Sequence, residues 1–123
     1  MIRIIFALVV LATGVTSSHA ASNCNVPYFK LLAHTEVTGQ MYVKAGKSCS
    51  VQSANSAGGN TGIEIRRRPS NGQVQLTGGF KITYKPRPGF VGKDSFAYVR
   101  NALDPRTGRP IQLPVNIDVT VEP

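Results

Sequence analysis

The sequence predicts an all-β domain, folded as a sandwich of two sheets with about seven strands. Apolar and polar residues alternate with a period of two in several short runs, as in strands that bury one face. Glycine, proline and asparagine separate these runs at short intervals, which is typical of a sandwich. No stretch of eleven or more residues carries apolar residues at helical spacing, so no substantial helix is expected.

The first 20 residues are interpreted as a cleaved secretory signal peptide. A short positive start ends at Arg3, residues 4–15 are almost wholly apolar, and Ser18 and Ala20 are small residues at the positions that a signal peptidase reads. An N-terminal anchor helix is the alternative, although the apolar run is shorter than the roughly 20 residues of a membrane span. We therefore expect a single domain at 21–123, without a transmembrane segment, in the periplasm or outside the cell.

Cys24 and Cys49 are the two cysteines of the chain, and an even count in an exported protein predicts one disulfide. Lipid attachment at Cys24 is the alternative, but residues 21–23 lack the branched apolar residue and the small last residue of such a site. Two cysteines and His34 fall short of the four ligands of a structural zinc. No metal or other cofactor is expected.

The first half of the domain carries the weaker strand patterns. Glycines at 39 and 46 are expected in turns between these strands, and residues 53–62 form a long loop rich in small and polar residues. The expected strands are 28–33, 41–44 and 48–52.

The second half carries the clearer patterns. Val115, Ile117, Val119 and Val121 alternate with polar residues, and this predicts a strand with one buried face. Asn71-Gly72 indicates a two-residue hairpin, because both positions tolerate positive φ, and Gly78-Gly79 is interpreted in the same way. The other expected strands are 63–65, 73–77, 80–85 and 96–98, and the second long loop is 101–110.

One motif covers most of this half. It reads Pro69-x-Asn71-Gly72-x-Val74, then Phe80-x-Ile82-x-Tyr84-x-Pro86-x-Pro88-Gly89-Phe90-x-Gly92-x-Asp94-x-Phe96-x-Tyr98, and then the strand at 115–121. Over roughly 63–122, the chain resembles the bacterial immunoglobulin-like, cadherin-like modules of surface and secreted proteins. The resemblance implies an immunoglobulin-like sandwich that serves as a spacer, adhesion unit or binding domain. Such modules usually stand in tandem arrays, so a single module makes a spacer role less expected.

Most of this motif is interpreted as scaffold. Its rings fall on one face of each strand and should enter the core, while its prolines and glycines suit a crossing between sheets. Asp94, just before a strand, is expected to accept backbone N–H bonds in that turn. Calcium binding by Asp94 is the alternative, but Asp104 is the only acidic residue near it in sequence. The structural residues are Asn71, Gly72, Tyr84, Pro86, Gly89, Phe90, Gly92, Asp94, Phe96 and Tyr98.

Positive charge is the main lead to a partner. Without Arg3, 13 basic residues stand against six acidic residues, a formal charge of +7, which favours an acidic partner or simply solubility. Arginine suits bidentate binding of phosphate or carboxylate, although arginines at a strand end also protect a sheet edge. Whether the arginines meet at one end depends on the strand order. The candidate anion-binding residues are Arg66, Arg67, Arg68, Arg100, Arg106 and Arg109.

Catalysis finds little support. His34 and Glu36 would share a face of a strand, but a surface pair is the commoner meaning, and the carboxylates are scattered singly. We therefore expect an exported binding or adhesion module and not an enzyme. Its partner would be an envelope polyanion, such as an anionic glycan or lipid headgroup, or a surface protein; specific nucleic-acid binding is not expected. The alternative is a secreted inhibitor that presents the loop 101–110 to an enzyme.

Overall fold

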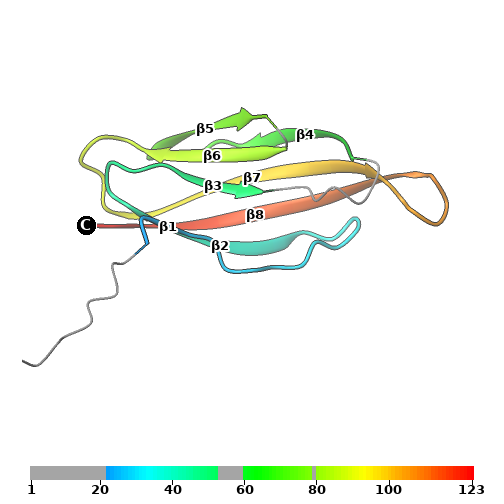
Figure 1. Cartoon of the computed structure of the whole chain (residues 1–123), viewed down its shortest axis with the longest axis horizontal. Coiled ribbons are helices and arrows are strands. Elements are labelled where there is room, and N and C mark those ends of the chain that lie inside the picture. Colours follow the sequence, from blue (N-terminus) through cyan, green and yellow to red (C-terminus); the bar gives the residue numbers. More distant parts are fainter. Residues whose placement is uncertain (1–21, 53–59, 79) are drawn as a thin grey trace, which may run out of the picture.

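The protein is a sandwich of two β-sheets (Figure 1). The structure, a computed structural model, describes residues 22–52, 60–78 and 80–123, so the expected signal peptide and most of the expected loop at 53–62 lie outside the described residues. Residues 60–62, expected in that loop, instead begin a strand. The sheets have the strand orders β1-β2-β8-β7-β4 and β3-β6-β5, which confirms the all-β prediction. Among the described residues there is no helix that could cross a membrane. The strands are β1 (Cys24–Asn25), β2 (Val37–Lys44), β3 (Cys49–Gln52), β4 (Asn60–Arg67), β5 (Gly72–Thr77), β6 (Lys81–Pro86), β7 (Gly92–Leu103) and β8 (Pro110–Glu122).

The β7–β8 hairpin forms the centre of the larger sheet. β4 pairs with β7 antiparallel, while β2 pairs with β8 parallel, with Met41 opposite Val119. Alternate residues of these strands therefore point to the same side, toward the smaller sheet. Met41, Ile117 and Val119 are fully buried there, because each occupies an apolar position of the two-residue period.

Aromatic side chains fill the space between the sheets. Tyr84 comes from β6 of the smaller sheet and Phe96 from β7 of the larger one, and both are fully buried. Their rings stack with centroids 5.9 Å apart and an interplanar angle of 10°. Each ring of this size buries about 150–250 Å², so these rings supply a large share of the core.

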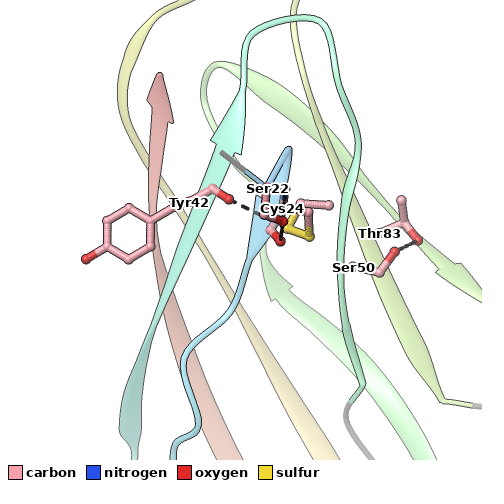
Figure 2. Close-up of a disulfide and its surroundings, with 6 residues drawn as sticks. Ser22, Cys24, Tyr42, Ser50 and Thr83 are labelled. Atoms are coloured by element: carbon pink, nitrogen blue, oxygen red, sulfur yellow. Dashed lines mark hydrogen bonds between the residues drawn. A yellow bond between two sulfur atoms is a disulfide. The ribbon is translucent and has the colours of Figure 1, made fainter. Parts of the chain in front are cut away.

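The predicted disulfide is present and joins the two sheets (Figure 2). Cys24 lies in β1 of the larger sheet, whereas Cys49 is buried in β3 of the smaller sheet. Next to the bridge, the hydroxyl groups of Ser50 and Thr83 lie 2.8 Å apart and connect β3 to β6. The bridge is consistent with an oxidising, exported environment.

The prediction of a strand at 28–33 is wrong. Only an isolated bridge between Leu32 and Thr35 forms in this region, and His34 lies in the turn between them with φ 55°. The prediction that His34 and Glu36 share a face of a strand is therefore also wrong. Gly39, expected in a turn, instead lies within β2, where a Cβ would come within 2.7 Å of the ring of Phe29. A glycine is required at this position because the ring packs directly on the backbone.

The prediction of a two-residue hairpin at Asn71-Gly72 is also wrong. This turn connects β4 of one sheet to β5 of the other, and neither residue has positive φ. Gly72 is needed for close approach, since a Cβ there would come within 2.5 Å of the Lys85 carbonyl oxygen. The hairpin between β5 and β6 does form, and Phe80 has φ 59° near its tip.

The crossing between sheets after β6 is as predicted. β6, the central strand of its sheet, ends at Pro86, and β7 begins at Gly92 in the other sheet. Gly89 and Gly92 have φ values of 78° and 139°, which residues with a Cβ atom rarely adopt. The guanidinium of Arg87 lies 5.3 Å from the centroid of the Phe90 ring, so this pair covers the corner.

Candidate functional site

Asp94 is the most densely bonded polar side chain of the predicted motif. Its Oδ1 atom accepts hydrogen bonds from the backbone N–H groups of Ser70 (3.0 Å) and Ser95 (2.9 Å). Its Oδ2 atom accepts bonds from the Asn71 N–H group (3.0 Å) and the Tyr84 hydroxyl (2.8 Å). Asp94 accepts backbone N–H bonds as predicted, but its expected place is wrong: Asp94 lies within β7 and holds the distant β4–β5 turn. The carboxylate thus links both sheets.

Burial raises the pKa of the Tyr84 hydroxyl above its ordinary value, and the hydrogen bond to Asp94 raises it further. Tyr84 therefore stays a neutral donor to the carboxylate at physiological pH. The Tyr84 hydroxyl and the Asp94 carboxylate satisfy each other's hydrogen-bonding capacity. This favours a structural role for the pair over a catalytic one.

We expect that neither calcium nor its chelation changes the melting temperature of the protein. Both oxygens of Asp94 are engaged, and no group of three or more His, Cys, Asp or Glu residues that could hold a metal exists in the described ranges. Thermal unfolding with excess calcium and with a chelator checks this. A shift of several degrees between the two conditions would restore a metal site.

The three consecutive arginines at 66–68 bond mainly to other residues of this chain. Arg66 forms an exposed ion pair with Glu64 at 3.4 Å. Arg67 extends across β7, where its Nη2 atom donates to the Ser95 hydroxyl (3.2 Å) and to the side-chain oxygen of Asn116 in β8. Arg68 donates to the Val74 carbonyl of β5 at 3.4 Å. These contacts secure the β4 end of the sandwich.

The six candidate arginines do not form one surface. Arg67 pairs with Ala97, whereas the loop with Arg106 and Arg109 follows Leu103, at the far end of β7. Six residues of strand separate the two positions by about 20 Å. Arg100 is distinct again, because it lies on the inner side of β7, in phase with the buried Tyr98.

The loop between β7 and β8 is shorter than the predicted 101–110, because β7 extends to Leu103 and β8 begins at Pro110. This loop has a defined internal structure. The Asp104 carboxylate accepts bonds from the N–H groups of Arg106 (2.7 Å) and Thr107 (3.2 Å). The Asp104 backbone accepts a bond from Gly108 N–H (2.8 Å) and donates one to the Arg109 carbonyl (2.8 Å). Since four hydrogen bonds converge on Asp104, the loop is preorganised.

This loop also projects from the sandwich (Figure 1). β4 pairs with β7 only as far as Ala102, and β2 pairs with β8 only from Val115 onward. We call residues 103–110 the hairpin tip. Its exposed side chains are those of Leu103, Pro105, Arg106, Thr107, Arg109 and Pro110.

Sequence reasoning missed a cleft between β3 and the segment that follows β1. It is lined by residues 26–29 and Leu31, by residues 50–52 of β3, and by Tyr98 and Arg100 of β7, with a volume of about 540 Å³. The available signal was Arg100 itself, a charged residue at an inward-facing position of the two-residue period. No known protein family matches this chain, and no curated protein matches it either.

Proposed function

We propose that the protein is an exported binding module that contacts a partner protein through the hairpin tip. The observation that carries this proposal is the preorganised loop, which projects beyond its neighbouring strands and is closed by Asp104. Binding through an ordered loop avoids the entropy cost of ordering it on contact. The disulfide and the motif similar to bacterial immunoglobulin-like, cadherin-like modules support an adhesion or binding role at the cell envelope or outside the cell.

The chemistry of the tip favours a protein with an acidic surface as the partner. Arg106 and Arg109 are exposed, while the charge of Asp104 is directed to N–H groups of its own loop. The exposed prolines and Leu103 add apolar area beside the two guanidinium groups. Arginine with adjacent apolar area is typical of the energetically important part of an interface.

A polyanion receives less support than a protein partner. A glycan or lipid surface would be bound most strongly by arginines gathered on one face, but the candidate arginines are divided among separate places. The same tip also fits the second candidate, an inhibitor, since a narrow rigid loop is the element that enters an enzyme cleft. The two candidates differ only in the partner: a surface protein or an enzyme.

The test is chemical cross-linking of the mature protein to envelope and secreted proteins of the cells that make it. We expect one protein to be captured, and capture to be lost on the double substitution Arg106→Ser with Arg109→Ser. Lys81→Ser with Lys85→Ser is the matched control, because both lysines are exposed on β6 and the change in charge is the same. Equal losses from the two variants would indicate diffuse attraction and contradict the proposal.

A third variant separates loop shape from charge. Asp104→Ala makes the protein more positive but removes two hydrogen bonds that shape the tip. We expect weaker capture of the same partner, because the loop must then be ordered on binding. Stronger capture would mean that charge alone drives the contact. Inhibition of the captured protein's activity would identify the inhibitor, and unchanged activity the adhesion module.

A further inference from the structure

A cleft opens between β3 and the segment 26–31, away from the hairpin tip. The segment belongs to no strand, and its residues Val26, Phe29 and Leu31 turn apolar side chains toward the core. Val51 of β3 supplies another apolar wall. The volume of about 540 Å³ lies within the range of 300–1,000 Å³ of small-molecule sites. The cleft can therefore take an apolar group.

The Tyr98 side chain gives the cleft an unsatisfied polar group. Tyr98 is 1% exposed, and its hydroxyl has no hydrogen-bond partner among the described residues. Burying a hydroxyl without a partner is costly, and most buried polar atoms in folded proteins are paired. A phenylalanine would fill the same space without that cost. Within the described ranges, the hydroxyl is thus a donor without an acceptor.

Arg100 adds positive charge next to Tyr98. Both residues lie on the inner side of β7 and both line the cleft. Burial lowers the pKa of the Arg100 guanidinium, yet it remains charged at physiological pH. Arg100 already makes other contacts, and a guanidinium carries five N–H groups that can donate to more than one acceptor. A phenolic donor and a guanidinium side by side match the two oxygens of a carboxylate.

We propose that this cleft binds a small organic carboxylate with an apolar body. The carboxylate accepts hydrogen bonds from the Tyr98 hydroxyl and the Arg100 guanidinium, and the apolar body packs between Val51 and the segment 26–31. Because the hydroxyl is buried, the proposal requires that the segment 26–31, which belongs to no strand, shifts outward to admit the carboxylate. The site is separate from the hairpin tip, so it stands or fails independently of the proposed function.

The test is a titration of the mature protein with octanoate, octanol and acetate, followed by backbone amide NMR. We expect octanoate to shift the signals of residues 26–31 and 50–52 in a saturable way. Octanol lacks the charge and acetate lacks the apolar body, so both should bind at least about tenfold more weakly. No saturable shift at the cleft with octanoate, or equal affinity for octanoate and octanol, would overturn the proposal.

Two substitutions assign the contacts. Tyr98→Phe and Arg100→Gln should each weaken octanoate binding by about tenfold, which is the effect of one hydrogen bond to a charged group. Arg109→Gln is the control, because it makes the same change at the hairpin tip and should leave binding unchanged. Tyr98→Phe should melt at or above the temperature of the parent protein, since it removes an unpaired hydroxyl, and this shows that it is folded. Parent-like affinity of Tyr98→Phe, or an equal loss from Arg109→Gln, would refute the assignment.

Discussion

Replacing Asp94 with alanine is expected to lower the free energy of unfolding by about 3–5 kcal/mol. The substitution removes the acceptor of three backbone N–H bonds and one hydroxyl bond. Hydrogen bonds to a charged group each contribute about 1.5–3 kcal/mol. In the alanine variant, water can bond to the donors near the surface, so the expected loss is smaller than the sum of the four bonds. The Tyr84 residue is fully buried, so the alanine variant leaves its hydroxyl without that acceptor. Thermal or denaturant unfolding measures the loss.

Two other substitutions show whether the carboxylate acts as a hub. Tyr84→Phe removes one of the four bonds and should cost about 1.5–2 kcal/mol, below the cost of Asp94→Ala. Asp118→Ala removes a carboxylate from the exposed face of β8, where it bonds only to the Asn116 side chain among the contacts described, and should cost about 0.5 kcal/mol or less. If Asp94→Ala costs no more than Asp118→Ala, the hub interpretation is wrong.

Reduction of the Cys24–Cys49 bridge is expected to lower the free energy of unfolding by about 2–4 kcal/mol. The bridge closes a loop with a sequence separation of 25 residues, and opening it enlarges the set of unfolded conformations. The bridge also holds β1 and β3 together across the two sheets, so reduction should loosen that edge of the sandwich first. Denaturant unfolding with and without a reductant measures the difference.

The double variant Cys24→Ala with Cys49→Ala is the control for this experiment. It should be as unstable as the reduced parent protein, and the reductant should leave it unchanged, since it has no bridge to open. Both cysteines of the chain form this bridge, so no other thiol contributes. A parent protein whose stability does not respond to complete reduction would contradict the prediction.

Much of the fold was predictable because strand patterns are local. The alternation of Val115, Ile117, Val119 and Val121 identified β8 and its buried face, and the structure buries all four side chains. Cysteine parity predicted the disulfide, and the glycines and prolines of 86–92 predicted the crossing between sheets. Each of these inferences needed only neighbouring residues, or a count that is independent of the strand order.

The candidate sites were less predictable. Asn71-Gly72 had the composition of a hairpin, but the turn joins different sheets, and Gly72 is required by the nearby Lys85 carbonyl. The candidate arginines were grouped because they carry the same charge, but they lie apart in space, because strand pairing sets their positions. The Tyr98 hydroxyl has no partner in the part of the chain that the structure describes, and this could not be inferred from sequence, since a buried tyrosine usually finds a partner.

The sequence by itself determined the all-β class, the centres of most strands, which side chains of the clear strands face the core, and that the two cysteines pair. The tertiary structure alone decided that Asp94 holds a turn more than 20 residues earlier in the chain, that the hairpin tip projects, and that a cleft lies beside Tyr98 and Arg100. The physical reason is the range of the interactions. Side-chain direction repeats every two residues along a strand, whereas hydrogen-bond partners and cavities depend on strand order, which residues far apart in the sequence settle together by packing.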